Sequence, residues 1–163
     1  MNANPRNQFR DVLKQFHTAM LVTRSPNGAL RSRPMHIAEV ESDSALWFVT
    51  NTESGKMGEI EADPHVNVSM QSGTQYLSIN GVAHLEQDRD RIRDLWSESW
   101  AVWFPDGLHD PHIGLIRVEA KDGEYWDMSG LKRFQYLFRA GQALIQGDTV
   151  DMDSPAMHGR VNL

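Results

Sequence analysis

Hydrophobic and polar positions alternate along much of this chain, and the alternation predicts strands rather than long helices. From Leu77 to Leu85, for example, every second side chain is apolar or small, as in a strand with one buried face. In all, six strands are predicted, at residues 18–24, 30–40, 44–50, 66–70, 77–85 and 113–126. Helical spacing of apolar residues predicts short helices at residues 7–17, 54–62, 88–96 and 130–140.

The short connections indicate how these strands are arranged. Ser25-Pro-Asn-Gly28 is a turn signal, because Asn-Gly accepts positive φ. Pro34 has no backbone N–H, so its strand is expected to have a free edge or a split at that point. No Gly-x-Gly-x-x-Gly follows a strand, which argues against a dinucleotide-binding fold. The expected fold is mainly β (α+β), a closed or nearly closed antiparallel barrel with Greek-key-like connections and short flanking helices.

Composition adds limits on domain number and partners. The chain has 163 residues, of which 40% are hydrophobic and 23% charged, enough for one domain with a core. The net charge of −6 argues against nonspecific binding to nucleic acid or to a membrane surface. There is no cysteine, which excludes disulfides and thiolate chemistry. We assign residues 1–141 to the domain and the polar, aperiodic residues 142–163 to a C-terminal tail or covering arm.

The first residues are polar and do not resemble a secretory signal, and no apolar run is long enough to span a membrane. A cytoplasmic location is therefore expected.

A local group of cations is unusual in such an acidic chain. Arg31 and Arg33 are two residues apart in a predicted strand and project from one face, where like charges are unfavourable unless an anion lies near. Lys56 lies in the first turn of a predicted helix, a position that the helix dipole favours for acids, and a bound phosphate would reverse this penalty. Thr52 or Ser54 can cap the same helix. Together these residues indicate a site for an anionic ligand.

Each of these signals also has an ordinary structural explanation. The two arginines can be solvated on an edge strand, where charge opposes aggregation. Lys56 can be a surface residue behind a common helix cap. The aromatic residues between 96 and 104 can line a substrate pocket, although aromatics at this spacing more often pack in a core or a dimer interface. His109 and His112 lie in a loop without an identifiable third ligand, so no metal site is expected there.

Several short motifs occur in order between residues 31 and 127. They are Arg31-Ser-Arg-Pro-Met35, Leu46-Trp-Phe-Val-Thr-Asn51, Ser54-Gly-Lys56, Asp63-Pro64, Phe104-Pro-Asp-Gly-Leu108 and Glu124-Tyr-Trp-Asp127. In this order the motifs resemble those of the pyridoxamine 5′-phosphate oxidase-related flavoproteins, and among them the general stress protein 26 branch. The resemblance covers residues 7–138 and leaves out the last part of the chain.

The resemblance implies a six-stranded antiparallel split β-barrel that binds FMN, usually as a homodimer with a flavin in each of two clefts between subunits. The cofactor-binding residues that it implies are Arg31, Ser32, Arg33, Pro34, Met35, Val49, Thr50, Ser54, Lys56, Gln75 and Trp126. Arg33, Ser54 and Lys56 match residues at the FMN phosphate, and Arg31 would accompany Arg33. The remaining residues match positions near the flavin ring, its edge or its ribityl chain. No metal is implied.

The chain departs from the family pattern in two places. Gly55 stands where many relatives have a second basic residue before Lys56. The arginine-rich C-terminal signature of true pyridoxamine 5′-phosphate oxidases is missing after Asp127, so that vitamin substrate is not expected.

The resemblance leaves three functions open: an FMN-dependent oxidoreductase of unknown substrate, a flavin-binding stress or sensor protein with little turnover, and the same barrel with deazaflavin F420 or haem. No catalytic residue is identified from the sequence.

Overall fold

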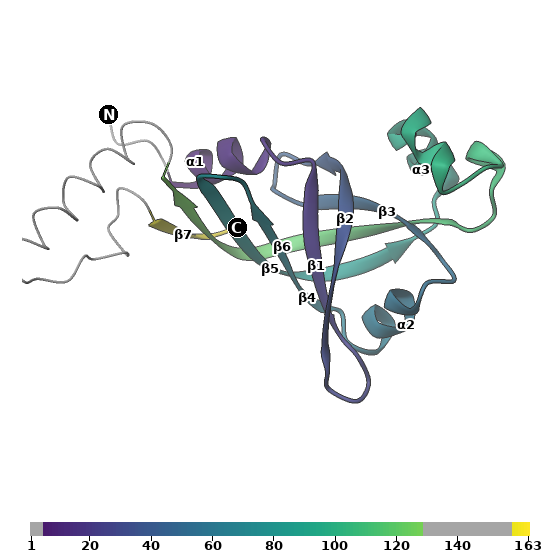
Figure 1. Ribbon diagram of the computed structural model, residues 1–163, viewed down its shortest axis with the longest axis horizontal. Helices are drawn as coiled ribbons and strands as arrows, with labels where there is room; N and C mark the ends of the chain where they lie inside the picture. The colour runs from purple at the N-terminus through teal and green to yellow at the C-terminus, as the bar shows by residue number, and fades with distance from the viewer. Residues whose placement is uncertain (1–4, 129–157) are drawn as a thin grey trace, which may run out of the picture.

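Six strands close into an antiparallel barrel because β3 pairs with β2 on one side and with β6 on the other. The computed structural model describes residues 5–128 and 158–163, and each strand pairing in this part is antiparallel. The barrel strands are β1 (Thr18–Arg24), β2 (Leu30–Val40), β3 (Leu46–Asn51), β4 (His65–Gln71), β5 (Gln75–Glu86) and β6 (Ile113–Asp127) (Figure 1). A further strand, β7 (His158–Asn162), pairs with the end of β6. The predicted fold class is confirmed.

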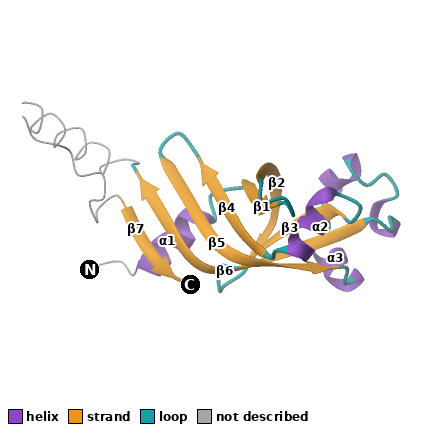
Figure 2. Ribbon diagram, turned by 90° about the horizontal axis from the view of Figure 1, so that it is seen from below, coloured by secondary structure: helices purple, strands orange, loops and turns teal. Residues whose placement is uncertain are grey.

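Short helices lie at both ends of this sheet. The helices are α1 (Pro5–Leu13), α2 (Gly55–Ala62) and α3 (Arg89–Leu95), followed by the 3-10 turns η1 (Glu98–Val102) and η2 (Gly107–His109). Figures 1 and 2 both show α2 and α3 at one end of the molecule and α1 with β7 at the other. The two ends therefore present different elements to a ligand.

Strand β3 separates two hydrophobic cores. Leu46 and Phe48 point into the barrel, whereas Trp47 and Val49 belong to a second core beneath α3 and η1. Successive side chains of a strand point to opposite faces, so a strand that is covered on both faces is apolar throughout. This double burial explains why Ala45-Leu-Trp-Phe-Val49 contains no polar residue.

The barrel is split between β2 and β3. Strand β2 pairs with β1 from Leu30 to His36, but its pairing with β3 begins at Ile37. Beyond Phe48, β3 continues to Asn51 beside β6, with no β2 partner in the described residues. The first half of β2 therefore has an edge that no described strand covers, as the proline at position 34 predicts.

The register explains why Pro34 is tolerated. Ile37 N–H donates to His17 O, and Ser25 N–H donates to Ala29 O, so the odd-numbered residues of β2 turn their backbone groups toward β1. In an antiparallel pair this direction alternates. The even-numbered residues, Pro34 among them, point their backbone groups toward the split, where a missing N–H costs no ladder bond.

The predicted elements agree with the observed ones apart from their ends. Strand β6 contains a bulge at Lys121, because Gly81 pairs with Ala120 and Asn80 with Asp122. The predicted helix at residues 130–140 lies outside the described residues, and so does most of the predicted tail. Strand β7 was not predicted, and it places the last residues of the chain in the sheet.

Candidate functional site

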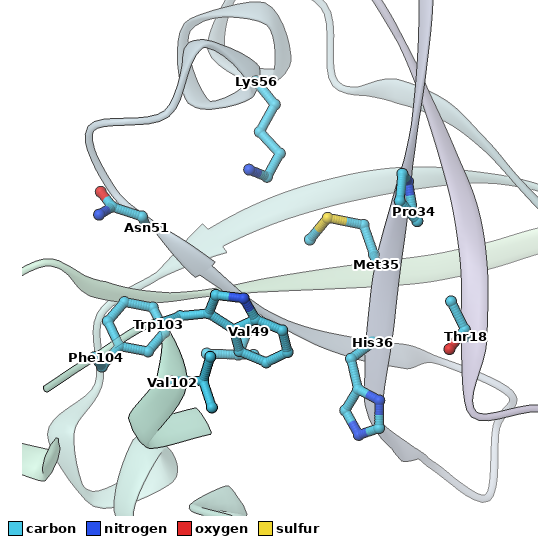
Figure 3. Close-up of a pocket in the computed structure, with 10 residues that line it drawn as sticks. All are labelled: Thr18, Pro34, Met35, His36, Val49, Asn51, Lys56, Val102, Trp103 and Phe104. Carbon is cyan, nitrogen blue, oxygen red and sulfur yellow. The ribbon is translucent and has the colours of Figure 1, made fainter. Parts of the chain in front are cut away.

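A cleft of about 770 Å³ opens at the split between β2 and β3. Its walls come from the start of β1, the free edge of β2, the end of β3, the first turn of α2 and the end of η1. The lining residues are Thr18, Pro34, Met35, His36, Val49, Asn51, Lys56, Val102, Trp103 and Phe104 (Figure 3). The lining is mainly apolar, apart from Thr18, His36 and Asn51, and it carries the Lys56 cation at α2.

Four of the residues implied by the resemblance line this cleft: Pro34, Met35, Val49 and Lys56. Met35 is buried in the barrel core, and Val49 belongs to the core beneath η1. Their side chains form the floor of the cleft between the two diverging strands. Ser32 is exposed on the free part of β2, with its backbone directed to the split.

Thr50 and Val49 cannot both face the cleft, because they are neighbours on one strand. Val49 lines it, whereas the Thr50 hydroxyl lies 3.5 Å from the Ser54 hydroxyl. Ser54 is the residue before α2, and its side chain makes no capping hydrogen bond within the described part of the chain. It accepts a hydrogen bond from Lys56 Nζ at 2.9 Å instead. The structure thus brings the Thr50 and Ser54 hydroxyls and the Lys56 ammonium together at the start of α2.

The Lys56 ammonium is half-buried at the α2 end of the cleft. Burial lowers its pKa below the ordinary value of 10.5, and the positive charge of Arg33 lowers it further, while Glu59 acts in the opposite direction. In Figure 3 the side chain extends from α2 toward the space between Asn51 and Met35. An anion bound there would offset both the burial and the repulsion from Arg33.

Arg31 and Arg33 lie beside an anion that the sequence analysis did not consider, the carboxylate of Glu59 on α2. Arg33 Nη2 donates to Glu59 Oε2 at 2.8 Å, and Arg31 Nε lies 3.4 Å from Glu59 Oε1. Glu59 is only 7% exposed. Neither arginine is among the residues that line the cleft, but Arg33 is close enough to Lys56 to lower its pKa.

Hydrogen bonds keep Glu59 ionised. The Thr23 hydroxyl donates to Glu59 Oε2 at 2.5 Å, and this bond is the largest cause that lowers the pKa of Glu59 below its ordinary value. The hydrogen bond and charge of Arg33 and the charge of Arg31 act in the same direction, against the effect of burial. Sequence reasoning missed Glu59 and Thr23 because neither forms part of a motif.

Gln75 and Trp126 lie away from this cleft in the same chain. They stand at the end of the sheet that carries α1 and β7, where Gln75 pairs with Asp127 and Trp126 with His158. The Trp126 ring stacks on His158 with centroids 4.8 Å apart. The chain therefore brings Thr50, Ser54 and Lys56 together beside the cleft but leaves Gln75 and Trp126 at the opposite end of the sheet.

The aromatic segment at 96–104 divides its residues between the second core and the cleft. Trp100 and Phe104 are buried in that core, whereas Trp103 is 59% exposed and Val102 is 81% exposed on the cleft wall. Because buried residues hold the segment on both sides of Trp103, its exposure is a fixed property of the wall. Spacing alone could not separate the residues buried in the core from those exposed on the cleft wall.

Within residues 5–128 and 158–163, no cluster of three or more His, Asp or Glu side chains is arranged to hold a metal ion. No helix in the same residues has the length and apolarity needed to cross a membrane.

Comparison with known proteins identifies the family. A family profile described as "Pyridoxamine 5′-phosphate oxidase like" matches residues 4–151. Protein bli-3 of Neurospora crassa is 36% identical over 137 residues, which covers 74% of this chain and 66% of that protein. The chain therefore spans slightly less than two thirds of the length of this relative.

Two solved structures share the fold. A general stress protein 26 from Jannaschia sp. superposes with a TM-score of 0.72 and 24% identity, covering 97% of this chain and 98% of the other. The general stress FMN/FAD binding protein from Xanthomonas citri has a TM-score of 0.65 and 26% identity, and the match covers 76% of this chain and 88% of the other. With the split barrel and its cleft, these matches establish that the chain belongs to the pyridoxamine 5′-phosphate oxidase-like family.

Proposed function

We propose that this protein binds FMN in the cleft at the barrel split and acts as an FMN-dependent oxidoreductase. The observation that carries the proposal is the position of Lys56, a half-buried cation at one end of a cleft whose other walls are mainly apolar. A flavin mononucleotide has a flat, largely apolar ring and an anionic phosphate at the end of its ribityl chain, and these features match the two parts of the cleft.

The phosphate would bind at the start of α2. Lys56 and Ser54 are already in hydrogen-bond contact there, and the Thr50 hydroxyl adjoins them. The α2 N-terminus contributes the positive end of its dipole. Arg33, with Arg31 beside it, adds positive charge near Lys56.

The ring would lie along β2 and β3. Met35 and Val49 supply an apolar surface, and the free edge of β2 directs the backbone groups of Ser32, Pro34 and His36 toward the split. Backbone donors and acceptors on such an edge can hydrogen-bond to the polar rim of a flavin. When bound, FMN would supply the two-electron chemistry, while this chain would hold it and control access to it.

We further propose that Gln75 and Trp126 act on the flavin of a partner subunit. Within one chain they lie at the end opposite to the cleft, so only a second copy could bring them to the ring. This arrangement requires a homodimer with two equivalent clefts along its twofold interface. His158 covers one face of the Trp126 ring, so a flavin would meet the other face or the ring edge.

The function is tested by adding FMN to apoprotein and then NADH or NADPH. We expect one FMN to bind per chain, and Lys56→Ala and Arg33→Ala each to weaken binding by about 10- to 150-fold, because a hydrogen bond to a charged group contributes about 1.5–3 kcal/mol. Bleaching of the flavin absorption by either nucleotide, followed by reoxidation with an added acceptor, would support an oxidoreductase.

The controls separate binding from turnover. Glu61→Gln changes an exposed residue on the same helix and should leave the affinity for FMN as in wild type. Wild-type affinity in both Lys56→Ala and Arg33→Ala would contradict the proposed site. FMN that binds but is reduced by neither nucleotide would favour a flavin-binding stress or sensor protein instead.

A further inference from the structure

We propose that Thr23 and Glu59 are positioning residues that hold the Arg33 guanidinium ready for the FMN phosphate before the ligand binds. The inference rests on the proposed function and extends it to two residues for which neither the motifs nor the family resemblance suggests a role.

The three side chains come from three different elements and form a closed set of hydrogen bonds. Arg33 Nη1 donates to Thr23 Oγ1 at 2.5 Å, and Arg33 Nη2 donates to Glu59 Oε2 at 2.8 Å. Thr23 Oγ1 in turn donates to the same Glu59 oxygen at 2.5 Å. The guanidinium is therefore fixed at two of its nitrogens by groups on β1 and α2.

Burial makes this arrangement rigid. Thr23 and Glu59 are both buried, and the Arg33 side chain is 22% exposed. A long side chain that is already held in one orientation loses less conformational freedom when it binds a ligand. The two hydrogen bonds use two of the five N–H donors of the guanidinium, which leaves donors for a phosphate oxygen.

The charge of Glu59 is compatible with an anionic ligand. Arg31 and Arg33 both lie within 4 Å of this carboxylate, and Lys56 is close enough to sense its charge. Three cations around one carboxylate leave an excess of two positive charges, which matches a phosphate monoester dianion. Glu59 thus orients the arginines without neutralising the site.

Thr23 offers the sharper test, because it can be changed without a change of charge. Thr23→Val keeps the shape of the side chain and removes the hydroxyl, whereas Thr23→Ser keeps the hydroxyl. The dissociation constants of FMN and of riboflavin, which lacks the phosphate, are measured for each variant by quenching of flavin fluorescence. We expect Thr23→Val to weaken FMN binding about five- to tenfold and to leave riboflavin binding as in wild type. Thr23→Ser should bind FMN as tightly as the wild-type protein does, because it keeps the hydroxyl.

A second comparison asks whether Thr23 acts through Arg33. In an Arg33→Ala background, Thr23→Val should cause no further loss of FMN affinity, because the guanidinium that it orients is gone. A loss of the same size in both backgrounds would overturn the proposal. Equal losses for FMN and riboflavin, or unchanged FMN binding by Thr23→Val, would overturn it as well.

If Thr23→Val fails to fold, Glu59→Asp takes its place under the same criteria, since it keeps the charge but shortens the reach to Arg33. Wild-type protein that binds neither flavin would instead overturn the proposed function, and this inference with it. Wild-type protein that binds FMN while the variants keep full affinity would overturn the inference alone.

Discussion

The environment of each residue at the candidate site depends on the face of the strand from which its side chain points. Val49 and Thr50 are neighbours on β3, yet one lines the cleft and the other joins the hydroxyl pair at α2. Arg33 and Met35 share a face of β2, but Met35 enters the core while Arg33 meets the buried carboxylate of Glu59. One carboxylate therefore decides the environment of both arginines.

Glu59 should make the stability of the apoprotein depend on acid pH. Its pKa is lower in the folded protein than its ordinary value of 4.5, first because of the Thr23 hydrogen bond and then because of Arg33 and Arg31. A carboxyl group with a lowered pKa stabilises the fold above its unfolded pKa, and this stabilisation is lost as the pH falls through the folded value. Glu59→Gln should therefore lower the free energy of unfolding by about 1.5–3 kcal/mol near neutral pH.

The measurement is urea unfolding of wild type and Glu59→Gln at a series of pH values. The difference in the free energy of unfolding between wild type and Glu59→Gln should shrink as the pH falls below 4.5 and vanish once Glu59 is protonated. Glu61→Gln, on the exposed side of α2, should show little difference at any pH. A difference between wild type and Glu59→Gln that stays constant into strong acid would show that the charge of Glu59 does not stabilise the fold.

Part of the site can be predicted at this scale and part cannot. The spacing of Arg31 and Arg33 places them on one face of a strand and demands a nearby anion, and the structure supplies one in Glu59. Nothing in the sequence identifies Glu59, because a glutamate inside a short helix is ordinary. Its burial depends on α2 packing against β1, which is a tertiary contact that spacing does not encode.

The strands that the sequence predicts best are those in which buried and exposed side chains alternate regularly. β4 and β5 alternate between buried and less buried residues, so their polarity pattern predicts them directly. β7 escaped prediction because five residues in a polar region carry too little pattern, and its pairing with β6 is decided by the sheet edge. The helix ends shift by a few residues for a related reason, since capping and packing decide them together.

The packing of α1 on the sheet depends on a glycine in β6. A Cβ at Gly123 would lie 2.5 Å from Cε2 of Phe9, a fully buried residue of α1. Neither the ring nor the strand backbone can move away easily, because both lie in the core. We expect Gly123→Ala to lower the free energy of unfolding by about 1–3 kcal/mol through overpacking.

A matched control comes from the other end of the molecule. Gly58 lies within α2, and a Cβ there would meet no atom within 4 Å. Gly58→Ala should be neutral or stabilise the protein by about 0.5–1 kcal/mol, because alanine favours a helix. Chemical unfolding of both variants measures the two effects, and equal stability of Gly123→Ala and wild type would show that α1 does not rest on this contact.

At the scale of the whole molecule, the predicted flavin site has its residues at two ends of one chain. Lys56 lies by α2, whereas Trp126 lies beside β7 at the opposite end. In a twofold homodimer each cleft would combine Lys56 of one subunit with the Trp126 side of its partner. Lys56→Ala or Trp126→Ala, present in both chains of a homodimer, would then damage both clefts.

Mixed dimers separate a shared site from a site within one chain. Lys56→Ala and Trp126→Ala chains carrying different tags are co-expressed, and dimers that hold both tags are purified and titrated with FMN. In a shared arrangement one cleft of each mixed dimer contains both substitutions and the other contains neither, so half of the clefts should bind FMN as tightly as wild type. Uniformly weak binding in the mixed dimers would show that each chain builds its flavin site alone, and failure to recover doubly tagged dimers would contradict the homodimer itself.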